Sequence, residues 1–260
     1  MDVRKEGGEV KPGLINRRWC LILPDQIADW DAITGWEIER IESMHRNLKW
    51  GDCLWEIGAE HGWMAALYAR EFVGGENMVL VEPSIEMWRN IWLTWGYNDL
   101  RFPVGFWPGF VSHSGDNPPF EFTRAWPKEA MMSYDECPAM PYRSLVNPDD
   151  EDVPVTTIDK LVAAGIRPPD AISIDVEGAE LSVLRGAWDT LRTHHPKLWV
   201  SVHDGAENGD RNMMLEDYGD SVDLFVGFLN AAGYDYRWLN YDHEHHLFAW
   251  HQDDTKGIFQ

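Results

Sequence analysis

Two neighbouring stretches decide the fold: residues 53–69 read CLWEIGAEHGWMAALYA, and residues 78–84 read MVLVEPS. The first begins with an apolar run that predicts a β-strand, turns between Gly58 and Gly62, and continues into a predicted helix. The second is another apolar strand, which ends at Glu82. With the helix expected after it, this order of strand, turn, helix, strand and helix within about 45 residues predicts a parallel, right-handed crossover unit.

Further elements of the same kind lie on both sides of these stretches. Apolar residues at three- and four-residue steps predict a helix over residues 36–49. Ser84 is expected to be the N-cap of a helix that runs to Trp95 and is closed by Gly96. More strands are predicted at residues 102–106, 171–176 and 198–203, with a terminal antiparallel pair at 234–239 and 247–251. The expected fold is therefore α/β: one doubly wound sheet, mostly parallel, with a terminal antiparallel strand pair.

The domain organisation follows from where this pattern is strong. Residues 36–251 are expected to form one domain, preceded by an N-terminal arm over residues 1–35 and followed by a tail over residues 252–260. Residues 113–154 carry seven prolines and an acidic run, so they predict an irregular insertion. Long loops of this kind are usually binding loops or lids.

Composition excludes several classes of protein. The chain has 22 Lys and Arg against 44 Asp and Glu, a formal net charge of −22, which repels nucleic acid. Its three cysteines lack CxxC spacing, which argues against a disulfide framework and a zinc ribbon. There is no signal-peptide pattern and no apolar run of the roughly 18 residues that a membrane helix needs. We therefore expect a soluble, cytoplasmic protein with no membrane or nucleic-acid partner.

The glycine turn and Glu82 together predict a nucleoside-binding crevice. Gly58 and Gly62 allow a tight turn and close approach of a ligand, and Glu82, about 20 residues further on, can accept hydrogen bonds from both ribose hydroxyls. Glu56 and Glu60 would repel a pyrophosphate but suit the amino group and sulfonium of S-adenosylmethionine, which we therefore expect instead of NAD. The alternative is a turn that only packs helix against strand. The expected cofactor-binding residues are Glu56, Gly58, Ala59, Gly62, Trp63, Glu82, Pro83 and Ser84.

Acidic residues and a histidine end the next two strands. Asp175 and Glu177 are predicted to be catalytic, orienting a nucleophile or stabilising positive charge, and Glu180 to cap the following helix. Oxygens of this kind can hold Mg²⁺ or Ca²⁺, but they often bind no ion, so no metal is predicted. His203 is either a general base, oriented by Asp175, or a hydrogen-bonded loop residue. Residues 242–246 read DHEHH and fall where a hairpin turn is expected, so we expect a solvated turn there.

Several of these motifs resemble one known family. They are Gly51-Asp52, Trp55 to Trp63, Val81 to Ser84, Thr157 to Leu161, Ile174 to Glu180, Val183 to Ala187 and Val200 to His203. They resemble the FkbM-type S-adenosylmethionine-dependent methyltransferases over residues 36–205. The resemblance implies a class I Rossmann-like methyltransferase fold and O-methylation of a hydroxyl on a sugar or other small metabolite. The chain departs from the family at Glu56 and Glu60, where Asp and Asn are common, and at Ser201, near which the family has a Glu.

Two other functions stay open. Residues 117–120 read NPPF, a motif with which amino-methyltransferases acting on nucleic acid or protein hold the target amino group. The segment before it is polar, however, where such enzymes have an apolar strand, and the net charge opposes DNA. The other alternative is a methyltransferase-like binding module that has lost turnover.

Overall fold

The computed structural model describes residues 10–24, 37–116, 125–127, 130, 153–204, 214–241 and 244–254. Most of the predicted insertion at 113–154 and all of the NPPF motif at 117–120 lie outside the described residues. The predicted domain boundaries stay a prediction. Among the residues that the structure describes, no helix is both long and apolar enough to span a membrane.

The centre of the molecule is a seven-stranded sheet in the described part of the chain, with the order β10-β11-β9-β8-β3-β4-β5. Its strands are β3 (Leu54–Ile57), β4 (Met78–Val81), β5 (Gly105–Trp107), β8 (Ala171–Ile174), β9 (Lys197–Val202), β10 (Tyr234–Tyr241) and β11 (His245–His251). β3, β4, β5, β8 and β9 are parallel, whereas β11 is antiparallel to both of its neighbours. This confirms the predicted fold class. The strand order reverses at β3, so the sheet has its switch point there.

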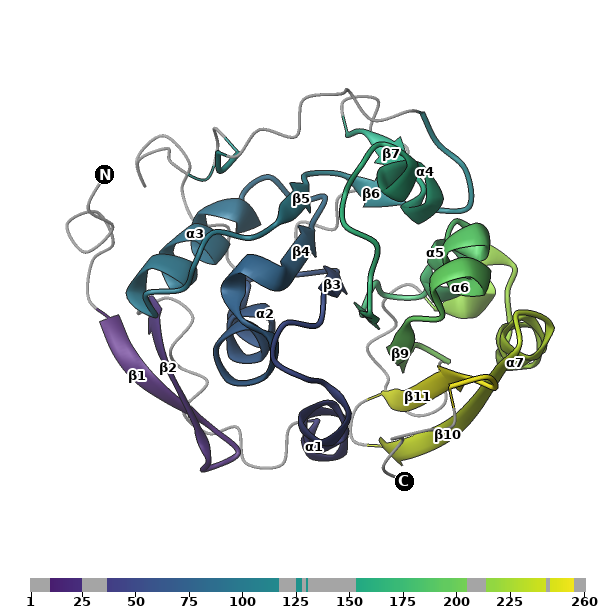
Figure 1. Ribbon diagram of the computed structural model, residues 1–260, viewed down its shortest axis with the longest axis horizontal. Helices are drawn as coiled ribbons and strands as arrows, with labels where there is room; N and C mark the ends of the chain where they lie inside the picture. The colour runs from purple at the N-terminus through teal and green to yellow at the C-terminus, as the bar shows by residue number, and fades with distance from the viewer. Residues whose placement is uncertain are drawn as a thin grey trace.

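Helices cover both faces of this sheet (Figure 1). One face packs against α1 (Ile38–Asn47), α2 (Trp63–Tyr68) and α3 (Met87–Tyr97), and the other against α4 (Ile158–Ala163), α5 (Glu180–Arg185), α6 (Trp188–His194) and α7 (Val222–Ala231). Every residue of β3, β4 and β8 is buried. Strands covered on both faces favour apolar side chains, which explains why they are nearly continuous apolar runs, interrupted only by Glu56 in β3 and Ser173 in β8.

The start of α3 differs from the prediction. Its N-cap is Glu86, with no side-chain cap hydrogen bond, and Gly96 lies inside the helix. Ser84 is instead in the preceding loop, where its N–H donates to Glu82 at 2.8 Å and its hydroxyl contacts Glu86 at 3.1 Å. The predicted cap at Ser84 is therefore wrong, because Ser84 forms hydrogen bonds with Glu82 and Glu86 in the loop before the helix. The predicted stop at Gly96 is wrong because α3 continues to Tyr97.

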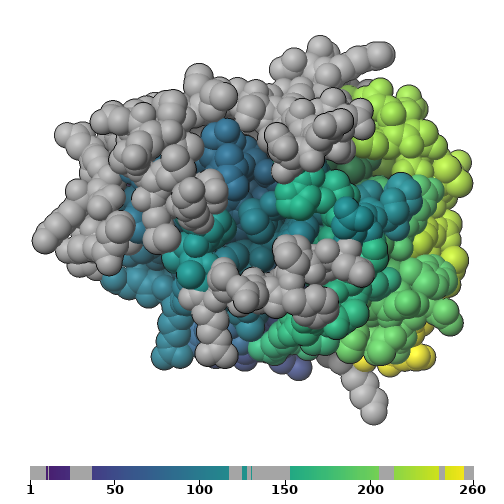
Figure 2. All heavy atoms as spheres, turned by 90° about the horizontal axis from the view of Figure 1, so that it is seen from above, coloured from purple at the N-terminus to yellow at the C-terminus, as the bar shows by residue number. Residues whose placement is uncertain are grey.

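Two small sheets accompany the central one. β1 (Val10–Ile15) and β2 (Trp19–Pro24) form an antiparallel hairpin, which packs on α2 and α3 within the segment expected to be an arm. β6 (Phe110–Val111) and β7 (Val155–Thr156) pair in parallel. In the view from above, the teal chain before the insertion lies beside the green chain after it (Figure 2). The two ends of the insertion are thus held side by side.

Candidate active site

The turn after β3 joins the ends of three strands. The N–H groups of Gly58 and Ala59 both donate to the carbonyl oxygen of Val81 in β4, at 3.0 Å each. Gly58 has a φ of +87°, and a Cβ there would lie 1.8 Å from the carbonyl oxygen of Asp175 after β8. Gly62 has a φ of +77°, and a Cβ there would lie 2.9 Å from the backbone of α3. Both positions therefore require glycine, as predicted from the need for a tight turn.

Glu82 lies beside this turn, at the end of β4. Its Oε2 atom accepts a hydrogen bond from the N–H of Glu60 and its Oε1 atom from that of Ser84, both at 2.8 Å. Burial raises the pKa of Glu82 to about 7, although these two N–H groups act in the opposite direction. Each carboxylate oxygen can accept a second hydrogen bond, so the group can still take ribose hydroxyls. Of the other residues predicted to contact the cofactor, Pro83 is half-buried and Trp63 is buried in the core.

Glu56 is a buried carboxyl group in β3. The residue is 3% exposed, and burial raises its pKa to about 7, although Arg40 acts in the opposite direction. Its Oε2 atom has no hydrogen-bond partner among the described residues. A buried acceptor without a partner costs free energy unless a ligand supplies a donor. The ammonium group of S-adenosylmethionine would supply one, so the residues at this end of β3 fit that cofactor.

Four carboxyl groups surround the imidazole ring of His203, which follows β9. The Nδ1 atom of His203 lies 2.6 Å from Oε1 of Glu180. Its Nε2 atom lies 3.1 Å from Glu244, 3.7 Å from Glu177 and 3.8 Å from Asp175. The structure thus brings together the three residues that the sequence assigns to catalysis, and it adds Glu180 and Glu244.

Glu180, rather than Asp175, orients His203. Its carboxylate is within hydrogen-bond distance of Nδ1, whereas the 3.8 Å between Asp175 and Nε2 is too long for a hydrogen bond. Glu180 lies in the first turn of α5 and accepts a hydrogen bond from the N–H of Gly178 at 2.9 Å, but no side-chain hydrogen bond caps the start of this helix. The predicted orientation by Asp175 is wrong, because the first turn of α5 brings Glu180 closer to the ring.

The carboxylates change the protonation of the cluster. Burial disfavours a charged His203, but the hydrogen bonds and charges of Glu180 and Glu244 outweigh it and hold the pKa of His203 well above its usual range. Burial and the charge of Glu244 also raise the pKa of Asp175, against the effects of Arg40 and His203. These effects favour the protonated, positively charged form of His203. It cannot act as the predicted general base until it loses that proton.

A buried arginine holds Asp175 from the other side. Arg40 in α1 is 1% exposed. Its guanidinium group lies 2.7 Å from Glu37, 2.8 Å from each of the hydroxyls of Ser173 and Ser201, and 3.4 Å from Oδ2 of Asp175. Sequence reasoning missed Arg40. A signal was present, because Ser173 and Ser201 interrupt apolar strands at positions that face α1.

The start of β11 also belongs to the site. The side chain of Glu244 is 14% exposed, His246 is fully buried, and Nδ1 of His246 lies 3.2 Å from the Ser201 hydroxyl. His245 is paired with Asp204. The predicted solvated turn is therefore wrong for Glu244, which lies in the turn but is mostly buried, and for His246, which is buried in β11. Residues 242–243 lie outside the described residues.

Strained backbone occurs in both loops that border the site. Glu60 in the glycine turn and Glu177 after β8 have φ angles of 44° and 53°. This left-handed conformation costs a non-glycine residue of the order of 1 kcal/mol and recurs at binding and catalytic sites. Glu177 is one of the carboxylates around His203, and the N–H of Glu60 donates to Glu82.

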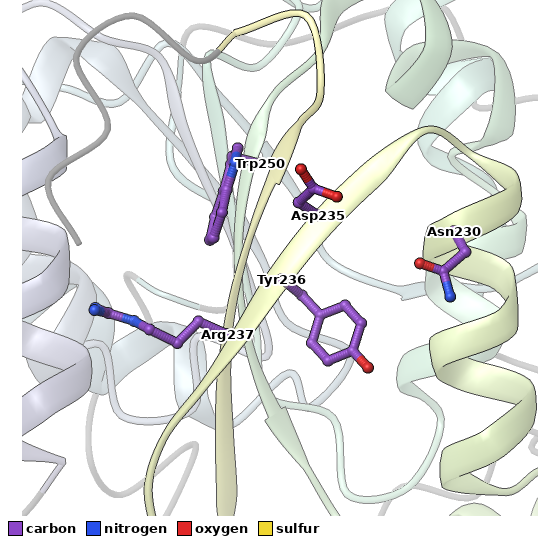
Figure 3. Close-up of a pocket in the computed structure, with 5 residues that line it drawn as sticks. All are labelled: Asn230, Asp235, Tyr236, Arg237 and Trp250. Atoms are coloured by element: carbon purple, nitrogen blue, oxygen red, sulfur yellow. The ribbon is translucent and has the colours of Figure 1, made fainter.

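A surface hollow elsewhere contains none of these residues. It has a volume of about 430 Å³ and is lined by Asn230, Asp235, Tyr236, Arg237 and Trp250. Tyr236 and Asn230 lie on one side of the edge strand β10, and Arg237 and Trp250 on the other (Figure 3). The hollow is thus a feature of the sheet edge, separate from the candidate active site.

The chain is similar to several proteins of known structure and to one family model. Among solved structures, the chain is similar to a methyltransferase FkbM from Methylobacillus flagellatus KT, with 17% identity over 77% of this chain and 44% of that chain and a TM-score of 0.48. It is also similar to a precorrin-6y C5,15-methyltransferase from Geobacter metallireducens GS-15, with 13% identity over 85% and 90% of the two chains and a TM-score of 0.44. A third similar structure is M. jannaschii TYW2 in complex with AdoMet, with 10% identity over 89% and 81% of the two chains and a TM-score of 0.43.

The chain thus spans less than half the length of the first of these structures. A search of curated proteins gave no match. The model of the methyltransferase FkbM domain matches residues 56–236, well over half of the chain. The chain therefore belongs to the FkbM methyltransferase family.

Proposed function

We propose that the protein is an S-adenosylmethionine-dependent methyltransferase that methylates a hydroxyl group of a sugar or other small metabolite. One observation carries the proposal: the buried, unpartnered Oε2 atom of Glu56 lies in the strand that leads into the glycine turn, and Glu82 is at the end of the next strand. The carboxyl group of Glu56 beside the turn opposes a pyrophosphate and favours a cationic compound, and Glu82 can accept hydrogen bonds from the ribose of an adenosine.

The residues divide into a cofactor side and an acceptor side. Glu56 and the backbone of Gly58 and Gly62 would hold the amino-acid end of the cofactor, and Glu82 the ribose. The cofactor supplies an electrophilic methyl group. The cluster around His203 would hold the acceptor hydroxyl.

In the proposed reaction, the acceptor oxygen attacks the methyl carbon in line with the sulfur, and the carbon–sulfur bond breaks. The hydroxyl proton passes to the acidic cluster, in which Asp175 has a raised pKa and so a raised affinity for that proton.

Binding of S-adenosylhomocysteine, measured by calorimetry, tests the cofactor side. We expect one site per chain, and we expect Glu82→Gln to weaken binding at least tenfold, a loss of about 1.4 kcal/mol. Glu76→Gln is the matched control, because Glu76 pairs with the exposed Arg101 just before the start of β4, at the opposite end of the strand. No binding by the unmodified protein, or equal binding by both variants, would overturn the proposed cofactor site.

Transfer of a labelled methyl group to a panel of sugars, hydroxylated metabolites, amines and nucleic acids tests the acceptor side. We expect label on a hydroxyl group of a small molecule. Label found on nucleic acid or amines instead would contradict the proposed acceptor, and the amino-methyltransferase alternative would then hold.

A further inference from the structure

Three side chains next to the ends of β8, β9 and β11 converge at the carboxyl end of the parallel strands. Asp175, His203 and Glu244 each offer one ligand atom, and these atoms lie within 4.8 Å of one another. The Nε2 atom of His203 lies 3.1 Å from Oε1 of Glu244 and 3.8 Å from Oδ1 of Asp175. Two ligands at about 2.1 Å from a tetrahedral ion are about 3.4 Å apart. The two separations from Nε2 are thus within about 0.4 Å of this value, and the third is no more than 4.8 Å.

The ring of His203 is oriented as a metal ligand would be. Its side chain is 9% exposed, and its buried Nε2 atom faces Oε1 of Glu244 at 3.1 Å. Its Nδ1 atom lies 2.6 Å from Glu180, which is fully buried. A metal-binding histidine characteristically donates its other ring N–H to a carboxylate, which directs the free lone pair toward the ion. Glu180 fills that role, so the Nε2 lone pair of a neutral His203 points at Asp175 and Glu244.

Asp175 is supported in the same way. Its Oδ2 atom accepts hydrogen bonds from Ser201 at 3.2 Å and from Arg40 at 3.4 Å. These bonds fix the carboxylate and leave Oδ1 facing His203. Ligating carboxylates are commonly held by hydrogen bonds of this kind.

The local charge favours a cation. Asp175, Glu177, Glu180 and Glu244 gather around one imidazole, and crowded, partly buried carboxylates repel one another unless a cation neutralises them. The other nearby cation, Arg40, is shared between Glu37 at 2.7 Å and Asp175 at 3.4 Å. This surplus is separate from the geometric argument and points to the same kind of ligand.

We propose that Asp175, His203 and Glu244 bind a first-row divalent cation. One imidazole and two carboxylates suit Mn²⁺, Fe²⁺ or Zn²⁺ better than Mg²⁺ or Ca²⁺, which prefer oxygen ligands alone. Three protein ligands leave positions open on the ion. A hydroxyl group bound there would lose its proton more readily, and that proton would pass to a neighbouring carboxylate. This catalytic role rests on the proposed function, whereas binding of the ion does not.

A second group of possible ligands serves as the control. His195, His251 and Asp253 also lie close enough to share an ion. The two imidazole rings are stacked, however, with centroids 3.5 Å apart and planes at 7°. Stacked rings direct their nitrogen lone pairs along parallel planes and not toward one point. His251→Gln is therefore expected to leave metal binding unchanged.

The experiment is titration of the full chain with MnCl₂, followed by the loss of the free Mn²⁺ signal in electron paramagnetic resonance. We expect one bound Mn²⁺ per chain, with binding at least tenfold weaker in Glu244→Gln and unchanged in His251→Gln. Pulsed measurements on the unmodified protein should show coupling of the bound Mn²⁺ to a histidine nitrogen, and this readout does not depend on any variant folding. Absence of binding, absence of nitrogen coupling, equal binding by Glu244→Gln, or loss of binding in His251→Gln would each overturn the proposal.

The result is independent of the test of the proposed function. Binding of S-adenosylhomocysteine is measured in the presence of EDTA. If S-adenosylhomocysteine binds and Mn²⁺ does not, the metal site is wrong and the cofactor site stands. If Mn²⁺ binds and S-adenosylhomocysteine does not, the cofactor site is wrong and the metal site stands.

Discussion

Replacing Glu82 with glutamine should change the way in which the stability of the protein depends on pH. Burial raises the pKa of this carboxyl group from 4.5 to about 7 in the folded protein, whereas in the unfolded chain it stays near 4.5. The folded state therefore holds the proton over a range in which the unfolded state has lost it. The free energy of unfolding falls as the pH rises from about 4.5 to about 7, and it levels off above that.

The magnitude follows from the two pKa values. A difference of about 2.5 pH units, at about 1.4 kcal/mol for each, corresponds to about 3 kcal/mol in total. Between pH 5.5 and pH 8.0 the loss is about 2 kcal/mol, because part of it occurs below pH 5.5. Glutamine does not ionise, so Glu82→Gln should lose about 2 kcal/mol less than the unmodified protein over this interval. Comparing two pH values cancels any fixed cost of the substitution.

The measurement is urea-induced unfolding at the two pH values and constant ionic strength, followed by the fluorescence of the 15 tryptophans. Glu76→Gln should show the pH dependence of the unmodified protein, because Glu76 pairs with an arginine whose side chain is 79% exposed. If Glu82→Gln and the unmodified protein lose the same free energy between the two pH values, Glu82 ionises normally and the reasoning is refuted.

Three further predictions concern the cofactor site, the glycine turn and the start of α4. The dissociation constant for S-adenosylhomocysteine should fall as the pH rises from 6 to 8, because Glu82 accepts two ribose hydroxyls best when ionised; calorimetry that shows constant affinity would contradict this. Gly58→Ala should destabilise the protein by about 3 kcal/mol, because its Cβ would meet a carbonyl oxygen at 1.8 Å. Gly165→Ala, with a φ of +100° and open surroundings, should cost only about 1 kcal/mol, and equal losses in urea unfolding would show that the close contact does not matter. Thr157→Ala should cost about 1 kcal/mol, since the Thr157 hydroxyl accepts the N–H of Lys160 at the start of α4; an unchanged unfolding midpoint would refute the cap.

The cofactor side of the site could be predicted from sequence because its signals are local. The apolar runs at 54–57 and 78–81, the glycines between them and Glu82 all lie within 30 residues of one another, and their geometry follows from one crossover unit. The structure needs glycine at both positions of the turn for the reason that the sequence suggested.

The acceptor side depends on contacts that sequence spacing does not reveal. Glu244 and His203 are brought together by the antiparallel pairing of β11 with β9, and Arg40 reaches Asp175 from a helix 135 residues earlier in the chain. A turn rich in charged residues is solvated in most proteins, so the prediction for residues 242–246 followed the ordinary case. Glu244 and His246 are mostly buried instead.

The short pairing of β6 with β7 has a consequence for how this protein can diversify. Val111 and Thr156 are direct neighbours in the β6–β7 pair, so the two ends of the segment between them are held at a fixed distance from each other. Closing such an excursion costs only about 0.6 kcal/mol more for each doubling of its length. Segments of different size and composition can therefore be exchanged between β6 and β7 while the strands that lead to Glu82 and Asp175 keep their register.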